Sequence, residues 1–420
     1  MERFVRAVIV LLTLIPLSVH GENPELVSTH CREVEVALDA KHSVSRLEGC
    51  GEEYSEDLLW DLDRIDQVDG TLDGHFDRTN RGAGSVVYVM DTGVMAAHTE
   101  FLDSSGRSRV IAGFDTSGVV PFGASRCRSD NKPVAPCYSN FDELVVSSHG
   151  TSVASIIAGR RVGVAPGADI VSIRVMNERG LATTRSYLDG LNAIIRHAWS
   201  EGVPPFRTAI VNISGWVLEQ LTAGSDPAPV PYAMVEQKMR DMAGGVDANG
   251  KADPNGKRFL FVVAANNVDT GCGASGYVDR FPAVVGKRVD GVITVGGMTV
   301  ENSFWSGSCR GDVEVLAPAK NIFSAFITGP DQYRGKKPNL RSGTSFAAPI
   351  ISGIAARLLA ESPAMTPAEL EAAITNTPSR IDNAAAVFAD GKVGYAETTL
   401  PTRPQPMISS GVTAENRSEH

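Results

Sequence analysis

Short apolar runs alternate with longer amphipathic stretches along the central part of this chain. The runs are rich in Val and Ile and lack a strict alternation of apolar and polar residues, which is typical of strands covered on both faces. They lie at 85–91, 168–176, 208–214, 259–265 and 291–297. Segments with helical periodicity lie between and after them, at 151–161, 186–202 and 347–362. Strands and helices in this arrangement predict an α/β fold of three layers, α/β/α, with a mainly parallel central sheet.

The N-terminus has the pattern of an export signal. Residues 1–21 combine two arginines, an apolar run from Ala7 to Val19 and a small residue at Gly21. This is typical of a cleaved secretory signal peptide, and the run is too short to cross a bilayer comfortably as an anchor. We therefore expect a soluble protein that is secreted to the extracellular space.

The rest of the chain divides into three parts. Residues 22–58 are polar and acidic, and we interpret them as a short prosegment or N-terminal extension. Residues 59–397 carry the strand and helix pattern, with a turn-rich stretch at about 217–257 that we interpret as an insertion. Residues 398–420 form a polar tail.

Composition limits the partners. The 420 residues include 43% hydrophobic residues, which suits a globular protein with a substantial core. The formal net charge is −10 and no long basic run is present, which argues against nucleic acid and anionic membranes as partners. We expect a monomer.

The six cysteines favour disulfides, because an even number behind a signal peptide is typical of an oxidising compartment. None forms a CxxC pair, so a zinc site is not expected. Proximity in the sequence favours three pairs among the several possible pairings, namely Cys31–Cys50, Cys127–Cys137 and the remaining Cys272–Cys309.

One polar stretch resembles part of a calcium loop. Its oxygen donors are Asp247, Asn249, Asp253 and Asn255. An EF-hand would also need a closing glutamate and flanking helices, and neither is clear. A solvated turn is the favoured interpretation, and we expect no metal site there.

Three polar residues fall where buried elements end or begin. Asp91 ends the strand at 85–91, where a buried carboxylate needs a partner. His149 precedes a helix and is followed by Gly150, which lets another backbone approach closely. Ser345 lies at the start of a further helix, where a serine taken alone is more often a cap than a nucleophile.

Together these residues are the components of an activated hydroxyl. Histidine accepts the proton of serine, and aspartate orients the histidine. The chain order Asp, His, Ser is that of subtilisin and differs from the Ser, Asp, His order of α/β-hydrolases. An aspartic protease would need two Asp-Thr-Gly motifs, and the near repeat at Asp115 lacks the glycine.

Several segments carry a specific resemblance. VMDTGV, HGTSVA, GVAPGADIVSIRV and SGTSFAAP resemble the signature segments of the subtilisin family of serine endopeptidases, and WDLDRIDQ is similar to the mature start in its proteinase K-like branch. The likeness covers about residues 59–395. It implies a subtilisin-like fold and a secreted enzyme that hydrolyses peptide bonds in proteins through an acyl-enzyme, with no cofactor needed for catalysis. It also implies that Ser345 attacks, His149 relays the proton and Asp91 orients His149.

The resemblance extends to groups around the nucleophile. It implies that Asn266 and backbone N–H groups stabilise the oxyanion, with Asn267 as the alternative if the turn is shifted by one residue. The family usually has glycine where this chain has Ala265. Two segments are expected to hold an extended peptide between them, Gly180-Leu181-Ala182 and Ser214-Gly215-Trp216.

Trp216 departs from the family pattern, because a glycine there normally leaves room for the substrate residue before the scissile bond. The tryptophan either narrows that pocket or turns outward and makes a new wall. Ser152 and Ser155 replace a histidine and a glycine of the usual motif, and neither is chemically required.

Other departures concern maturation and stability. The segment at 22–58 is too short to be the family's usual inhibitory prodomain. The pair Cys272–Cys309 resembles a disulfide of some proteinase K-like members. The acidic residue that some relatives use for a structural calcium is absent near Thr299, so calcium stays an open expectation. Asn416 is a glycosylation acceptor, whereas Asn212 falls in a core strand.

Two rival functions differ from the endopeptidase. One is a catalytically idle subtilase fold that acts as a binding protein, for which Trp216, Ala265 and the short prosegment are the motivation. The other is a different serine hydrolase such as an esterase. Covalent labelling of Ser345 and turnover of a protein substrate separate these possibilities.

Overall fold

The computed structural model describes most of the central chain with its side chains. It does so for residues 59–66, 72–103, 105–117, 148–177, 180–217, 230–273, 276–326 and 340–376. For residues 32–37, 43–48, 339 and 394–395 it describes backbone strands alone. Several predicted features lie outside the described residues, namely the signal peptide, the polar tail with Asn416, and the pairs Cys31–Cys50 and Cys127–Cys137.

A parallel β-sheet forms the middle of the molecule. Its strands, in the order in which they lie side by side, are β13 (Gly394–Tyr395), β10 (Val315–Pro318), β9 (Val292–Met298), β8 (Arg258–Ala264), β7 (Thr208–Ile213), β4 (Val86–Asp91), β6 (Asp169–Arg174) and β5 (Val110–Asp115). Every neighbouring pair is parallel. The five predicted strands are confirmed as β4, β6, β7, β8 and β9, whereas β5 and β10 were not among them.

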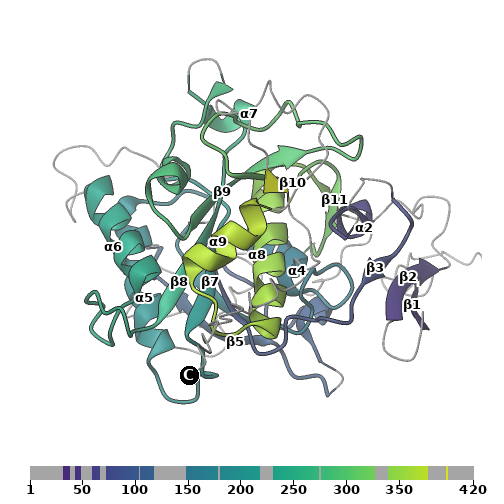
Figure 1. Ribbon diagram of the computed structural model, residues 1–420, viewed down its shortest axis with the longest axis horizontal. Coiled ribbons are helices and arrows are strands. Elements are labelled where there is room, and N and C mark those ends of the chain that lie inside the picture. Colours follow the sequence, from purple (N-terminus) through teal and green to yellow (C-terminus); the bar gives the residue numbers. More distant parts are fainter. Residues whose placement is uncertain are drawn as a thin grey trace, which may run out of the picture.

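Helices cover both faces of this sheet (Figure 1). One face carries α5 (Thr184–Ala198) and α6 (Tyr232–Gly244), and the other carries α4 (His149–Ala158), α8 (Thr344–Glu361) and α9 (Pro367–Thr375). The helix α8 is 18 residues long and packs against α4, β7, β8, β9 and β10, so it runs through the centre of its layer. The predicted three-layer α/β/α fold is confirmed. Among the described helices, none is both long and apolar enough to cross a membrane.

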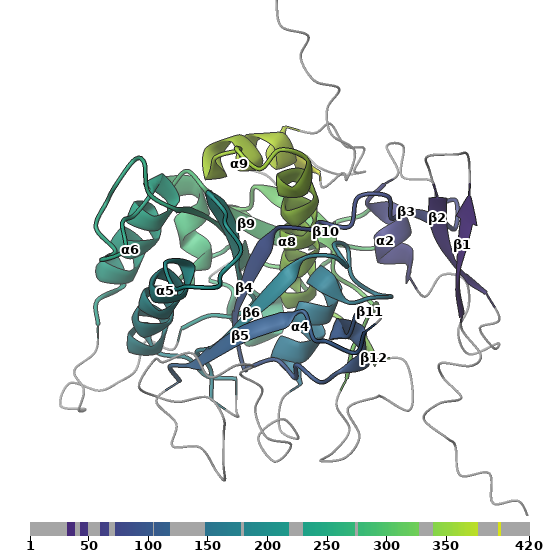
Figure 2. The same ribbon diagram turned by 90° about the horizontal axis from the view of Figure 1, so that it is seen from below.

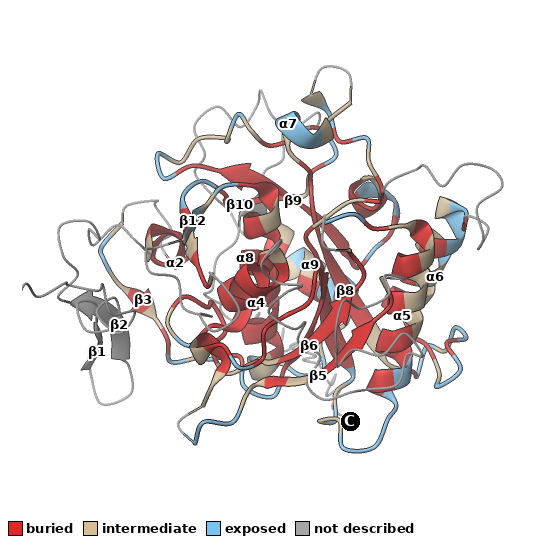
Figure 3. Ribbon diagram, turned by 180° about the vertical axis from the view of Figure 1, so that it is seen from behind, coloured by how far each residue is buried: buried red, intermediate tan, exposed pale blue. Residues whose placement is uncertain are grey.

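Each central strand contributes side chains to two hydrophobic layers. Along β4, Val87 and Val89 belong to the layer of α4 and α8, whereas Tyr88 and Met90 belong to the layer of α5 and α6. Every residue of β4 is buried, and Figure 3 shows the same burial in the neighbouring strands. Because successive side chains of a strand point to opposite faces, a strand covered on both sides is apolar throughout. This explains why the sequence shows no alternation.

Two of the described helices, α5 and α9, begin with a capping box, in which two residues exchange hydrogen bonds between backbone and side chain. Thr183 and Ser186 form a capping box at α5, with 3.0 Å from each backbone nitrogen to the other side chain. Thr366 and Glu369 form a second one at α9, whose first residue is Pro367. These bonds satisfy amide groups that the first helical turn leaves without partners. The helix α9 is not among the predicted elements, although this pattern marks its start.

The predicted turn-rich insertion at about 217–257 is wrong in part, because it contains α6. Val235, Met239 and Met242 of this helix are fully buried in the layer of α5. Their spacing puts them on one face of a helix. The helix α6 is therefore an integral part of the sheet's cover.

The turns predicted after α6 are present. Oδ1 of Asp247 accepts hydrogen bonds from the backbone N–H groups of Asn249 at 2.8 Å and Lys251 at 2.9 Å. Oδ1 of Asp253 accepts one from Asn255 N at 2.9 Å. In the described part of the chain, no group of three or more His, Cys, Asp or Glu residues is placed to hold a metal ion.

A small antiparallel sheet lies beside the main one (Figure 2). It consists of β1 (Arg32–Ala37), β2 (Ser43–Glu48) and β3 (Phe76–Asp77), so the segment at 22–58 supplies two of its strands. The remaining short elements are α2 (Trp60–Arg64), η2 (Thr99–Phe101), α7 (Val268–Gly271), η4 (Ala283–Arg288), β11 (Ile322–Ser324) and β12 (Asn339–Arg341). The predicted disulfide Cys272–Cys309 is present, with 5.5 Å between the Cα atoms.

Glu314, directly before β10, is a largely buried carboxyl group. Oε2 accepts a hydrogen bond from Thr294 N at 2.5 Å, and Oε1 has no partner in the described part of the chain. Burial raises the pKa of Glu314 to about 7. A carboxyl group with a higher pKa in the folded protein stabilises the fold below its unfolded pKa, and this stabilisation is lost as the pH rises through about 7.

We predict that Glu314→Gln reduces the loss of stability between pH 5 and pH 8. The amide keeps an acceptor for Thr294 N but carries no charge, so the variant should be about 1–3 kcal/mol more stable than the parent at pH 8. At pH 5, where the parent carboxyl is protonated, the two proteins should differ by less than about 1 kcal/mol. Urea unfolding at both pH values measures this. A difference that does not change with pH contradicts the assignment.

Candidate active site

Polar side chains gather at the carboxyl edge of the sheet. Asp91 is the last residue of β4, Ser214 follows β7 and Asn266 lies two residues after β8. His149 and Ser345 come from the first turns of α4 and α8. Parts of the chain that are far apart in sequence therefore meet at the edge where parallel α/β sheets hold their ligands.

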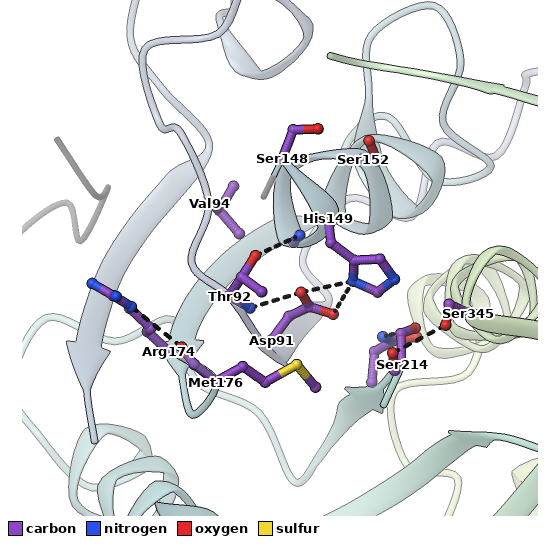
Figure 4. Close-up of polar contacts among 12 residues, drawn as sticks. Asp91, Thr92, Val94, Ser148, His149, Ser152, Arg174, Met176, Ser214 and Ser345 are labelled. Carbon is purple, nitrogen blue, oxygen red and sulfur yellow. Dashed lines mark hydrogen bonds and ion pairs between the residues drawn. The ribbon is translucent and has the colours of Figure 1, made fainter. Parts of the chain in front are cut away.

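Asp91 and His149 form a hydrogen-bonded pair (Figure 4). Nδ1 of His149 lies 2.9 Å from each carboxylate oxygen of Asp91. The Asp91 side chain is fully buried, whereas 24% of the His149 side chain is exposed. Because a buried carboxylate needs donors, we assign the proton of the neutral imidazole to Nδ1. Figure 4 shows the opposite edge of the ring on the side where Ser345 lies.

Backbone groups hold Asp91 in this position. The N–H of Thr92 donates to Oδ1 at 2.7 Å. The carbonyl oxygen of Asp91 accepts from Val175 N at 2.9 Å and from Met176 N at 3.3 Å. The strand end and the carboxylate are therefore both fixed before any substrate is present.

Gly150 lets the loop after β4 touch the first turn of α4. Its N–H donates to Oγ1 of Thr92 at 3.0 Å. A Cβ atom at this position would overlap the carbonyl oxygen of Gly93 and lie 3.1 Å from Oδ1 of Asp91. Glycine therefore permits the close backbone approach that the sequence predicts.

Ser345 is the second residue of α8, and the capping position belongs to Gly343. The Ser345 hydroxyl donates a hydrogen bond to the carbonyl oxygen of Ser214 at 3.1 Å. The ring of Phe346 packs against His149, with 5.4 Å between the ring centroids. The residue after the serine thus touches the imidazole, and the positive end of the α8 dipole lies at this point.

A buried hydrogen-bond chain fixes Ser214 against α8. Nδ2 of Asn212 donates to Oγ of Ser214 at 2.9 Å, and Oγ of Ser352 donates to Oδ1 of Asn212 at 3.0 Å. Asn212 is fully buried in β7, which confirms the prediction that it falls in a core strand.

The two asparagines after β8 have different surroundings. Oδ1 of Asn267 accepts from Thr344 N at 2.9 Å and from Thr344 Oγ1 at 3.2 Å, so Asn267 holds the start of α8. Asn266 has a φ of 73°, and its buried Nδ2 has no hydrogen-bond partner within the described residues. An amide group buried without a partner costs free energy, so this one is available to a ligand atom.

The disulfide lies beside the backbone of Asn266. The N–H of Cys309 donates to the carbonyl oxygen of Asn266 at 3.0 Å, and Val268 N donates to Gly307 O at 2.9 Å. The Cys272–Cys309 bond then joins the two loops covalently. Hydrogen bonds and the disulfide therefore fix the loop that carries Asn266 to the loop that carries Cys309.

The two predicted substrate-binding segments lie beside each other. Ala182 pairs in a parallel bridge with Val217, the residue after Trp216. Leu181 is 37% exposed, and Gly180 has a φ of 72° that favours glycine. The structure thus brings the first segment against the end of the second.

Trp216 is half-buried and stacks on an arginine. The guanidinium carbon of Arg280 lies 4.6 Å from the centroid of the Trp216 ring. Gly215 packs so closely on Met176 that a Cβ atom would overlap the end of the methionine side chain. The sequence alone gives no sign of the Arg280 contact.

Two serines that depart from the family motif secure a neighbouring loop. Oγ of Ser152 donates to the carbonyl oxygen of Ala325 at 2.7 Å, and Ala325 N donates to Oγ of Ser155 at 2.9 Å. These bonds join α4 to the residue after β11. The motif positions thus have a structural role that the sequence did not indicate.

Arg341 is a further residue of the site that sequence reasoning missed. Its Nη2 donates to Oγ of Ser148 at 2.7 Å, and its guanidinium lies over the rings of Phe326 and Phe346. Burial lowers the pKa of Arg341, and the side chain stays cationic because arginine titrates far above neutral pH. A positive charge therefore lies at the turn that carries His149.

The arrangement has the parts needed to activate a hydroxyl group. With Nδ1 bonded to Asp91, a neutral His149 has an unprotonated Nε2 that can accept a proton. A serine on that side can then act as a nucleophile. The unpartnered amide of Asn266 is a donor of the kind that stabilises a developing oxyanion.

Comparison with known proteins agrees with this geometry. Residues 82–397 match the subtilase family. The chain belongs to the subtilase family. The family prediction made from the sequence is therefore confirmed, and the match extends over the whole central sheet.

Among curated subtilases, the chain is 29% identical to alkaline serine exoprotease A of Vibrio alginolyticus over 326 residues, which cover 76% of this chain and 47% of that protein. It is 29% identical over 328 residues to the extracellular serine proteinase of Thermus sp., covering 77% of this chain and 63% of that one. A cuticle-degrading serine protease of Arthrobotrys oligospora is 27% identical over 314 residues, with coverages of 74% and 61%. The chain thus spans about half to three fifths of the length of these relatives.

The solved structures also include a match in fold. A cold adapted subtilisin-like serine proteinase superposes with a TM-score of 0.55 at 25% sequence identity. The match covers 81% of this chain and 98% of that structure. The part of the fold that the two proteins share therefore includes nearly all of the solved chain.

We predict that Gly150→Ala slows the reaction of Ser345 with a fluorophosphonate probe by about tenfold or more. The added methyl group displaces the loop beside Asp91 and should also lower the free energy of unfolding by about 1–3 kcal/mol. Labelling rates and urea unfolding measure the two effects. Gly244→Ala is the matched control, because a Cβ atom there meets nothing within 4 Å. Equal labelling rates for the two variants contradict the role of Gly150.

Proposed function

We propose that this subtilase is a secreted serine endopeptidase that hydrolyses peptide bonds in proteins through an acyl-enzyme. The observation that carries the proposal is the fully buried Asp91 carboxylate bonded to a partly exposed His149 beside Ser345. A purely structural pair has no need of an imidazole that opens to solvent on one edge. The relatives named as serine proteases support the same chemistry.

In the proposed reaction Ser345 Oγ attacks the carbonyl carbon of the scissile bond and His149 takes its proton. The Asn266 amide and the Ser345 N–H stabilise the oxyanion, and Asp91 stabilises the imidazolium. His149 then gives the proton to the leaving amine, which leaves the acyl group on Ser345. A water molecule then attacks the acyl group while His149 takes its proton. His149 returns the proton to Ser345 Oγ, which releases the carboxylic acid product and regenerates the enzyme. These steps need no cofactor.

The remaining parts of the proposal concern location and partners. The substrates are proteins or peptides held in extended form against the two segments that meet at Ala182 and Val217. The signal-peptide pattern of residues 1–21 and the extracellular relative support secretion. A structural calcium remains a separate expectation, which thermal unfolding with and without EDTA addresses.

We predict that Ser345→Ala abolishes labelling by a fluorophosphonate probe and lowers casein hydrolysis about 10⁴-fold or more, because the nucleophile is lost. The purified full chain is assayed beside the variant after its fold is checked by thermal unfolding. Equal labelling of the two proteins, or no turnover of casein by the parent at any pH, would overturn the proposal. Labelling without turnover of casein would favour a different serine hydrolase such as an esterase, and neither labelling nor turnover would favour the idle binding protein.

We predict that Asn266→Gly lowers kcat about 10²–10³-fold with little change in KM, because the lost amide donates in the transition state. Glycine accepts the left-handed backbone, so the turn is kept. Asn267→Ala is the comparison and should chiefly lower stability, because it removes the acceptor for Thr344. The reverse result, a larger loss of kcat at Asn267, would assign the oxyanion to Asn267.

A further inference from the structure

Geometry confines the substrate residue before the scissile bond to a small space. Its carbonyl carbon must approach Ser345 Oγ to about 3–3.5 Å, and its oxygen must lie about 3 Å from the donor at Asn266. Ser345 Oγ itself lies 3.1 Å from the carbonyl oxygen of Ser214. The side chain of that substrate residue branches from the Cα atom next to this carbonyl carbon, so it starts between the segment after β7 and the segment after β8.

Arg280 and Trp216 link these two segments away from the nucleophile. Trp216 belongs to the segment after β7, and its ring is stacked by the Arg280 guanidinium at 4.6 Å. Nε of Arg280 donates to the carbonyl oxygen of Gly271 at 2.9 Å, and Gly271 N donates to Asn267 O at 3.0 Å. The residue after Arg280 accepts a hydrogen bond from Val217 N at 3.2 Å. Arg280 thus contacts both segments, through Trp216 after β7 and Gly271 after β8.

The charge of Arg280 is not balanced within the described residues. Its side chain is half-buried, and its only hydrogen bond there uses Nε. The acidic residues closest in sequence, Asp279, Asp290 and Asp269, form no ion pair with it in that part of the chain. By contrast, Arg161 lies 2.7 Å from a carboxylate of this protein. The terminal N–H groups of Arg280 are therefore available to an external acceptor.

We propose that Arg280 selects an acidic residue, with glutamate preferred, on the amino side of the scissile bond. The proposal rests on the proposed endopeptidase function and names its substrate class. A guanidinium offers a planar pair of donors that matches a carboxylate, and a partly desolvated one gains more from such a partner than a fully hydrated one. The aromatic face of Trp216 holds the guanidinium in one orientation, so little side-chain entropy is lost on binding.

In this proposal Trp216 supports the Arg280 guanidinium at a position where the family usually has glycine. A glycine there leaves room for a large apolar side chain, whereas the indole and guanidinium together replace that room with a charged wall. The two alternatives left by the sequence, a narrowed pocket and an outward-turned wall, then make different predictions. A pocket that is merely filled favours alanine, and a charged wall favours glutamate over glutamine.

The first experiment uses the parent enzyme alone. Chromogenic tetrapeptides that differ only in the residue before the cleaved bond carry Glu, Gln, Phe, Ala or Lys at that position. Glu and Gln have the same shape, so the ratio of their kcat/KM values isolates the charge. We expect a ratio of about 10–100 in favour of Glu, lowered by 1 M NaCl. A ratio near one, or alanine as the best substrate, would overturn the proposal.

The second experiment changes the charge of Arg280. Arg280→Gln should bring the Glu-to-Gln ratio close to one, because the Glu carboxylate loses its charged partner whereas the Gln amide loses none. Arg280→Glu should favour Lys over Glu. Arg288→Gln is the control, because it removes a positive charge from an exposed side chain paired with Glu236 and should keep the parent ratio.

The outcomes separate this proposal from the function on which it rests. If the parent cleaves the Phe substrate and labels with fluorophosphonate but shows no Glu preference, the endopeptidase stands and the role of Arg280 is wrong. If no peptide is cleaved and casein is not cleaved, both proposals fail. Active-site titration of every variant with the probe corrects for folding, so a poorly folded Arg280 variant does not mimic a change in selectivity.

Discussion

A charged carboxylate at the buried end of a strand is the constraint on which this edge of the molecule depends. The Asp91 side chain has no exposed surface, so its charge must be balanced by donors inside the protein. One donor is the next backbone amide and the other is an imidazole from a helix that begins 58 positions later. To bring that helix close enough, the loop after β4 must touch it, and this requires a glycine at 150. The charge thus determines the local backbone as well as the orientation of His149.

A buried ion pair elsewhere in the same sheet shows what distinguishes the site. Arg174 and Asp115, at the ends of β6 and β5, lie 3.4 Å apart, and both side chains are almost completely buried. That pair is enclosed on all sides and has a structural role. The pair of Asp91 with His149 is enclosed only on the carboxylate side. In the proposed function, burial on one side and exposure on the other suit His149 to accept a proton.

Sequence reasoning placed residues correctly where the signal is local. Asp91 ends β4, His149 begins α4 and Ser345 lies in the first turn of α8, as expected, whereas their catalytic roles stay predictions. The five central strands were recognisable because strands covered on both faces are apolar throughout. The helix α6 was missed although Val235 and its stripe had the right period, because a turn-rich flank obscured it.

The rest of the site depends on contacts between distant residues. The different surroundings of Asn266 and Asn267 follow from the backbone turn and from which side chain binds Thr344, and the sequence does not show such a difference between neighbouring residues. The surroundings of Trp216 depend on Arg280, which lies in another loop. The bonds from Ser152 to Ala325 likewise join separate segments. Such pairings are products of the fold and have no signature in either segment alone.

The central position of α8 has a consequence for the cell that makes this protein. A ribosome delivers the carboxylate and the imidazole first, and Ser345 comes only after most of the sheet has been synthesised. The helix that carries the serine is also the one against which β7, β8, β9 and β10 pack. A chain that ends before α8 therefore lacks both Ser345 and a major part of its core. The proposed nucleophile and the packing of the central strands thus arrive with the same helix.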